Sequence, residues 1–310
     1  MQGGTGVVLP MPKPKLVLSK DTPLNSARKL VQRCYTNGMS RIIRHSNDTF
    51  YVWNGTHYID MRDENIRPAI WQFLDSAYCS AGGKFNPNPS KVAEVRAALA
   101  GLVQLPSTIQ APAWLDGAEH PPANEMLVCQ NGVLHLPTLV LHPHSPALFT
   151  LNALDYAHDA TAPHPPEWSR FLHSLWGDDH ESIATLQEMF GLLLTGETRH
   201  QKIFMLVGPK RSGKGTIARV LTALLGQANV ASPTLNALTQ TFGLQPLIGK
   251  RLAITALTAS SFAWFSCCAR RAAPRRCDAR LRGSWLARRM VRAFLLTSMR
   301  TDAAFSRCAT

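Results

Sequence analysis

A glycine-rich segment between an apolar run and an amphipathic pattern constrains this chain more than any other feature. Residues 203–207 read IFMLV, an unbroken apolar run typical of a buried parallel strand. Residues 208–214 follow as G-x-x-x-x-G-K. Apolar side chains then recur at the spacing of one helix face, at Ile217, Val220, Leu221, Leu224 and Leu225. This order of strand, loop and helix predicts an α/β core with a phosphate-binding loop, the alternative being a plain Gly-rich turn before a helix.

The residue types in this loop suit phosphate chemistry. Successive backbone N–H groups can turn inward to form an anion-binding nest, and the helix N-terminus adds partial positive charge. Lys214 can reach the β- and γ-phosphates and neutralise charge that develops in phosphoryl transfer, so it is the predicted catalytic residue. The predicted cofactor is a nucleotide, held by Gly208, Pro209, Lys210, Arg211, Ser212, Gly213, Lys214, Gly215 and Thr216.

The position after the lysine departs from the strict form of this motif. That form has Ser or Thr directly after the lysine, whereas here Gly215 follows and Thr216 comes next. The hydroxyl that usually binds Mg²⁺ is therefore displaced by one residue. Thr216 is the candidate Mg²⁺ ligand. The displaced hydroxyl affects the assignment of the metal ligand more than the assignment of nucleotide binding.

The rest of the chain predicts a mainly helical α+β domain before the ATPase core. The segments 24–35, 64–79, 90–105, 166–176 and 178–196 have helical patterns, with Ser90 as a plausible N-cap. The segments 49–61 and 126–146 are typical of hairpins. We expect the apolar residues at helical spacing in 166–176 to pack in the core rather than form a binding stripe; they are Trp168, Phe171, Leu172, Leu175 and Trp176.

Composition divides the chain further. We predict a flexible lead over 1–23, an α+β region over 24–130, a helical region over 131–200, a partial ATPase core over 201–256 and an atypical tail over 257–310. The net charge of +13 is concentrated in that tail, because the first 256 residues carry 22 basic and 18 acidic side chains. No apolar run is long enough for a membrane span and no secretory signal is visible, so we expect a cytoplasmic protein without membrane contact.

The residues around the loop resemble phage- and plasmid-type primase–helicases. The likeness is carried by NGVLHL, by LHPHSP, by the stretch from PEWSRFLHSLW through GPKRSGKGT, and by LTQTFGLQPLIGKRLAI. It is strongest over 131–254 and weaker over 24–130, where FYVWNGTHYI is similar to the start of the same region. In that family a poxvirus-type N-terminal region leads into a superfamily 3 helicase ATPase. The resemblance implies ATP-driven translocation on single-stranded or forked DNA by a homo-hexamer.

The same resemblance implies an acid that this sequence lacks. It makes residues 249–254, GKRLAI, the second core strand, which should end within a few residues in an acid that holds Mg²⁺. No Asp or Glu occurs from Thr198 through Cys277, and Asp278 is the first. The sensor residues and the arginine finger have no matched position either. The sequence therefore leaves open whether this chain is an active enzyme.

The tail differs in composition from everything before it. Residues 257–310 hold eleven Arg, no Lys and four of the seven Cys, which is typical of a GC-rich gene read in the wrong frame. We expect a frameshift or truncation from about Ala256, with a genuine basic helix at WLARRMVRAFLL as the alternative. On that interpretation Leu252 and Ile254 lose part of their packing, and the chain is poorly stable, binds ATP weakly and neither hydrolyses it nor unwinds DNA.

Three functions follow as hypotheses. The leading one is the ATP-binding part of a phage or plasmid replication helicase. The second is a nucleotide kinase, because adenylate-kinase-like enzymes also carry GKGT, although their loop lies near the N-terminus. The third is a non-catalytic remnant, or a fragment that binds DNA or a replication partner. DNA-stimulated hydrolysis, phosphate transfer to a nucleoside monophosphate, and binding without turnover separate the three.

Overall fold

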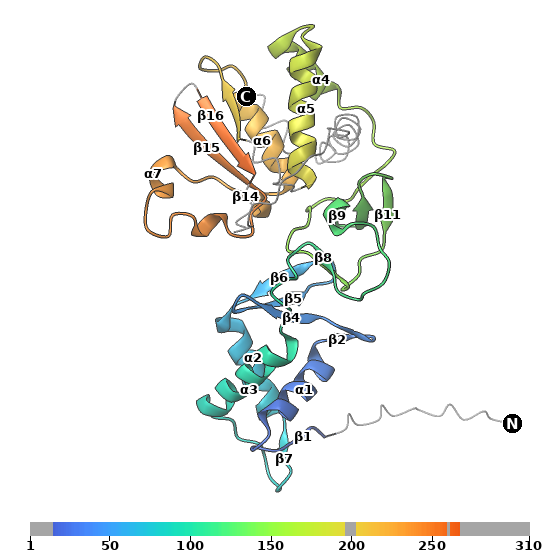
Figure 1. Cartoon of the computed structure of the whole chain (residues 1–310), viewed down its shortest axis with the longest axis vertical. Coiled ribbons are helices and arrows are strands. Elements are labelled where there is room, and N and C mark those ends of the chain that lie inside the picture. Colours follow the sequence, from blue (N-terminus) through green and yellow to red (C-terminus); the bar gives the residue numbers. More distant parts are fainter. Residues whose placement is uncertain (1–14, 196–202, 259–260, 267–310) are drawn as a thin grey trace, which may run out of the picture. The chain divides into compact units, whose positions relative to one another are not determined.

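The computed structural model describes residues 15–195, 203–258 and 261–266. The protein has a mixed α/β structure with small sheets (Figure 1). The chain divides into two compact units. Unit 1 contains residues up to Trp53 together with Ile59–Ile109, and unit 2 contains Asn54–Tyr58 together with the chain from Gln110. The predicted domain boundaries at 23, 130, 200 and 256 stay predictions.

Unit 1 packs three helices against short strands. The helices are α1 (Pro23–Cys34), α2 (Asp63–Asp75) and α3 (Pro89–Val103). The strands β4 (Ile43–Ser46), β5 (Thr49–Trp53) and β6 (Tyr58–Met61) form one sheet in this order. Two further pairs are β1 (Val17–Leu18) with β7 (Tyr78–Cys79), and β2 (Thr36–Asn37) with β3 (Ser40–Arg41). The helices predicted near residues 24, 64 and 90 and the hairpin at 49–61 are confirmed.

The N-cap predicted for α3 is wrong by two residues. Asn88, not Ser90, precedes the helix, and its Oδ1 accepts a hydrogen bond of 2.9 Å from the backbone N–H of Lys91. Pro89 takes the first helical position, where a missing N–H costs nothing. Ser90 lies inside the first turn, where its hydroxyl donates to Glu94.

Unit 2 begins with small antiparallel sheets followed by two helices. The strands β9 (Met126–Cys129), β10 (Gly132–His135) and β11 (Val140–His142) form one sheet, which confirms the predicted hairpin and adds a third strand. The strands β8 (Ala113–Trp114) and β12 (Leu148–Phe149) pair with each other. The helices α4 (Pro166–Trp176) and α5 (His180–Thr195) follow as predicted. Gly196, the last residue of the predicted helical segment 178–196, is outside the described part of the chain.

A four-stranded sheet carries the glycine-rich segment. Its strands are β13 (Ile203–Val207), β14 (Val230–Ala231), β15 (Leu252–Thr258) and β16 (Ser261–Ser266), in the order β13-β16-β15-β14. The pair β14 and β15 is parallel, whereas β16 runs antiparallel to both β13 and β15. The helix α6 (Lys214–Leu225) runs alongside this sheet with α5 beside it, and the short α7 (Leu235–Leu238) follows β14 (Figure 1).

The strand at 203–207 forms, but it is not buried as predicted. It lies at the edge of the described sheet, and its side chains alternate in exposure. Phe204 and Leu206 pack against the core, whereas Ile203, Met205 and Val207 are 69%, 58% and 71% exposed. The unbroken apolar run predicted that both faces of this strand are buried. Among the described residues, only the face with Phe204 and Leu206 is covered.

The core of unit 2 joins this sheet to the preceding helices. All five apolar residues predicted for one face of α6 are buried in it, which confirms that prediction. Trp168 and Leu172 of α4 are buried with them, while Phe171, Leu175 and Trp176 are partly buried against the same core. The expectation that Leu252 and Ile254 lack packing is wrong, since they are 0% and 9% exposed.

None of the helices in the described part of the chain is both long and apolar enough to cross a bilayer.

Candidate phosphate-binding site

The loop between β13 and α6 turns on two residues with left-handed backbone. Arg211 has φ of 65° and Gly213 has φ of 77°. Gly213 is the N-cap of α6, and an added Cβ there would lie 2.9 Å from Cζ of Phe171 and 3.0 Å from Cδ2 of Leu175. The position therefore needs glycine both for its backbone angle and for the close approach of α4.

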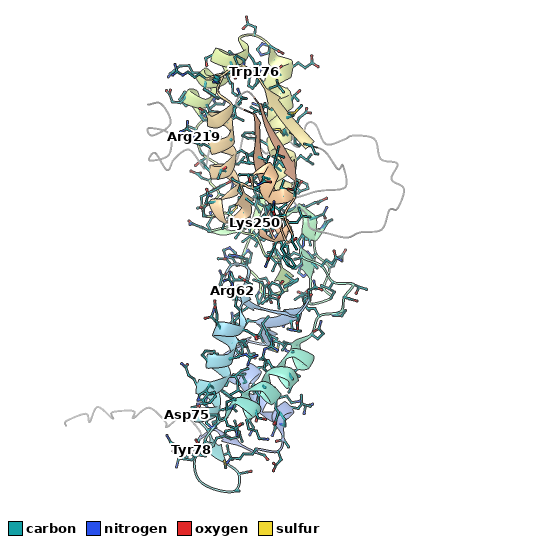
Figure 2. All side chains as sticks on the ribbon, turned by 90° about the vertical axis from the view of Figure 1, so that its left-hand side faces the viewer. Arg62, Asp75, Tyr78, Trp176, Arg219 and Lys250 are labelled. Carbon is teal, nitrogen blue, oxygen red and sulfur yellow. The ribbon has the colours of Figure 1, made fainter. Side chains whose placement is uncertain are left out.

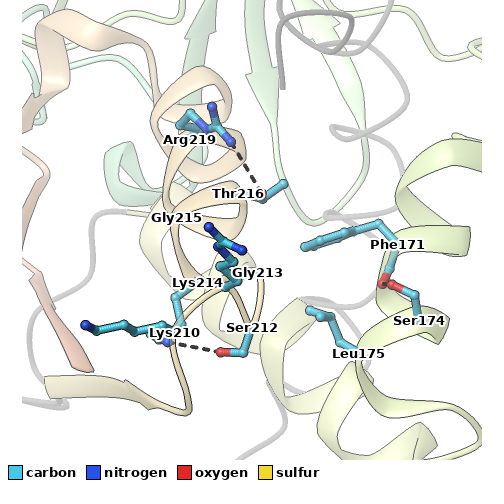
Figure 3. A pocket seen from close by; sticks show the side chains of 11 residues that line it. Phe171, Ser174, Leu175, Lys210, Ser212, Gly213, Lys214, Gly215, Thr216 and Arg219 are labelled. Atoms are coloured by element: carbon cyan, nitrogen blue, oxygen red, sulfur yellow. Dashed lines mark hydrogen bonds between the residues drawn. The ribbon is translucent and has the colours of Figure 1, made fainter. Parts of the chain in front are cut away.

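The ammonium group of Lys214 lies inside this loop. Its Nζ donates to the backbone oxygens of Gly208 at 2.9 Å and Pro209 at 2.7 Å, and to Oγ of Ser212 at 3.0 Å. The residue is only 7% exposed. Figure 3 draws its hydrogen bond to Ser212 as a dashed line. A lysine has three N–H donors, so the loop's own oxygens satisfy them all.

The first turn of α6 presents backbone donors at the same place. The N–H groups at the start of a helix have no acceptor within the helix. No side chain caps α6, and its first backbone hydrogen bond runs from the N–H of Ile217 to the oxygen of Gly213. The N–H groups from Lys214 to Thr216 are thus placed to bind an anion, with the helix dipole in support.

A hollow of about 470 Å³ opens over this turn. The loop and α6 provide its basic side chains, Lys210, Arg211, Lys214 and Arg219. Helix α4 provides the opposite side with Phe171, Ser174 and Leu175 (Figure 3). No carboxylate lines the hollow within the described residues. Four cations facing a space without acids favour a ligand with several negative charges.

The same lining offers little to a magnesium ion. Mg²⁺ prefers carboxylate, phosphate and water oxygens, and the oxygen-bearing side chains here are the hydroxyls of Ser174, Ser212 and Thr216. Oγ1 of Thr216 also accepts a 3.4 Å hydrogen bond from Nη2 of Arg219. Over the described ranges, no three His, Cys, Asp or Glu side chains come together as a metal site. The protein residues fit a polyphosphate better than they fit a metal of their own.

Most of the predicted loop residues line one hollow, and residues that the sequence did not single out for a site complete the lining. Lys210 through Thr216 all line the hollow, while Gly208 and Pro209 contact the ammonium of Lys214 instead. The residues missed are Phe171, Ser174, Leu175 and Arg219. Phe171 and Leu175 lie four residues apart on one helix face, a spacing that also suits a core stripe, so the pattern alone gave no signal for a second role. Arg219 lies one turn after Thr216, and this spacing is the only sequence signal for it.

Residues 28–177 match the family model described as D5 N terminal like. This is the N-terminal region of phage and poxvirus primase–helicases, so the first part of the resemblance is confirmed. The match includes FYVWNGTHYI, in the part where the likeness is weaker, and it ends at Gly177, the C-cap of α4 (Trp176, the last helical residue, is labelled in Figure 2). Phe171 and Leu175 therefore belong to the matched region, and the glycine-rich loop follows it.

Proposed function

We propose that the D5 N-terminal-like region at residues 28–177 precedes an incomplete P-loop ATPase core, and that residues 203–225 bind the phosphates of ATP. The chain is then the nucleotide-holding part of a phage- or virus-type primase–helicase. The observation that carries this proposal is the placement of one ammonium group. Nζ of Lys214 lies within a glycine-rich loop, next to an uncapped helix start, under a hollow lined by three further cations.

Bound phosphate would replace loop oxygens around Lys214. Its ammonium now binds two carbonyls and one hydroxyl, and a β- or γ-phosphate oxygen is a stronger, charge-assisted acceptor. The N–H groups of the first turn of α6 would bind the remaining phosphate oxygens. The loop needs only a local exchange of hydrogen bonds to accept the ligand.

Magnesium would enter with the nucleotide. In this proposal Thr216 supplies the protein's hydroxyl ligand, and phosphates and water supply the rest. Because no carboxylate lines the hollow in the described chain, the proposal covers nucleotide binding and assigns no residue to the activation of water.

DNA and self-assembly belong to the same proposal. A replication role implies binding to single-stranded or forked DNA and assembly into a homo-hexamer. The first 256 residues carry 22 basic and 18 acidic side chains, so they supply few phosphate contacts. DNA binding by this part is therefore modest and weakens as salt rises.

Calorimetry with a charge-matched control tests nucleotide binding. Lys214→Ala removes a charged donor from the phosphates and should weaken ATP binding about 10- to 100-fold. Lys84→Ala removes the same charge from an exposed site outside the hollow and should leave ATP affinity unchanged. Thermal unfolding of each variant checks that the fold is intact. Equal ATP affinity in the wild type and in a folded Lys214→Ala protein contradicts the proposal.

A further inference from the structure

The hollow has two chemically different sides. One side is the basic loop with the start of α6, and the other is the face of α4 that carries Phe171 and Leu175. Both residues are partly buried, and both point from α4 toward the loop (Figure 3). A polyphosphate has no apolar group that could contact this second side. A nucleotide does, because it joins a polyanion to a flat, largely apolar base.

The ring of Phe171 is held in place from behind. It stacks on the buried Trp168 with ring centroids 5.5 Å apart and planes 26° apart, and Trp168 stacks in turn on Phe190 of α5 at 6.0 Å. At the front, the close approach to Gly213 fixes the ring relative to the phosphate loop. A ring that is already ordered loses little entropy when a second ring packs on it.

We propose that Phe171 and Leu175 form the wall that takes the nucleobase of a nucleoside triphosphate whose phosphates lie on the loop. This inference rests on the function proposed above and extends it to the choice of ligand. The volume of about 470 Å³ lies within the range of about 300–1,000 Å³ that small-molecule sites occupy. Base–aromatic stacking adds affinity that a bare polyphosphate cannot gain.

The wall has little means to tell one base from another. Every base has a π-face, so stacking on a phenylalanine tolerates all of them. The polar group that α4 adds is the hydroxyl of Ser174, whose hydrogen is donated to the backbone oxygen of Phe171 at 2.7 Å. On the α6 side, Lys214 and Arg219 offer donors only, and the hydroxyl of Thr216 accepts from Nη2 of Arg219 at 3.4 Å. We therefore infer a site that accepts adenine and guanine nucleotides alike.

The test compares ATP, GTP and inorganic tripolyphosphate on the full-length chain by calorimetry. The wild type should bind ATP and GTP with affinities within about tenfold of each other. It should bind tripolyphosphate more weakly than either. Phe171→Ala should lower ATP affinity by about tenfold and leave tripolyphosphate affinity unchanged.

Comparing these ligands and variants separates base binding by Phe171 and Leu175 from phosphate binding by the loop. His173→Ala on the same helix is the control, because His173 is exposed and does not line the hollow. Tripolyphosphate binding also reports on folding, since it needs an intact loop. If Phe171→Ala lowers both affinities equally, or neither, the base wall is overturned while the phosphate site stands. If the wild type binds tripolyphosphate as tightly as ATP, the wall is again overturned. If it binds none of the three ligands, both the proposed function and this inference fail.

Discussion

Among single residues, Lys214 shows most clearly how the loop differs from an ordinary surface turn. A lysine in a surface turn extends into water, whereas here the side chain folds back so that its ammonium is enclosed by three loop oxygens. In the proposed complex, phosphate oxygens would take the place of these three oxygens around the ammonium. Binding would then require the exchange of three hydrogen bonds.

A second residue-scale prediction concerns the start of α3. Asn88→Ala removes the side chain that accepts from the N–H of Lys91, and the loss of an N-cap costs about 1 kcal/mol of folding free energy. Ser90→Ala removes a hydroxyl that does not cap the helix, two residues later, and should change the free energy of unfolding by clearly less. Urea unfolding of both variants gives the comparison. A larger loss from Ser90→Ala would mean that the helix starts later than the structure places it.

For the elements of unit 1, one carboxylate connects two helices. Asp63 at the start of α2 accepts from Arg96 of α3, with Oδ1 2.7 Å from Nη2, and from Arg67 one turn along α2. The guanidinium of Arg96 also lies 5.6 Å from the ring centre of Phe50 in β5. Asp75, the last residue of α2, also carries a carboxylate (labelled in Figure 2). Within the described residues it forms no ion pair.

This link makes the stability of unit 1 depend on pH. The hydrogen bond from Arg96 holds the pKa of Asp63 below its usual value. A carboxyl whose pKa is lowered on folding stabilises the fold above its unfolded pKa, and this contribution is lost as pH falls through the lowered pKa. Because the pair is partly exposed, we expect Asp63→Asn to cost no more than about 1 kcal/mol at neutral pH.

Unfolding by urea at several pH values checks this prediction. The difference between the wild type and Asp63→Asn should shrink as pH falls through the acidic range and vanish once Asp63 is protonated. Asp75→Asn is the control: this carboxylate lies at the C-terminal end of α2, where the helix dipole does not favour it, so its removal should not lower stability at neutral pH. A difference for Asp63→Asn that is constant with pH would mean that the charge of this carboxylate does not contribute.

The elements also show where sequence patterns suffice and where they fail. Helices with a clear apolar face, such as α6, could be predicted together with their buried residues, because the pattern is set by the helix itself. Strand β13 could be predicted as a strand but not as an edge strand, because its neighbours come from residues far along the chain. β16 was missed for a related reason, since it lies in the compositionally atypical tail, and its aromatic run SFAWFS was the signal available.

For the whole molecule, the candidate site depends on packing between distant segments. The loop at 208–214 follows from its sequence, whereas the opposite side of the hollow comes from α4, about forty residues earlier. Both sides meet because α4, α5, α6 and the sheet share one core. No local pattern specifies that meeting. The region that matches the D5 N terminal like model thus lines one side of the candidate site, and the glycine-rich loop on the other side lies beyond the match.

In the proposed function, the start of α6 and the loop before it bind nucleotide phosphates. Amide NMR spectra of the ¹⁵N-labelled chain, recorded while ATP is added, test it most directly. We expect the N–H signals of Gly213, Lys214, Gly215 and Thr216 to move most, because phosphate oxygens would accept from these groups. Tripolyphosphate should move the same signals, and adenosine without phosphates should not. If saturating ATP leaves these four signals in place, or moves signals only in unit 1, nucleotide binding at this loop is contradicted.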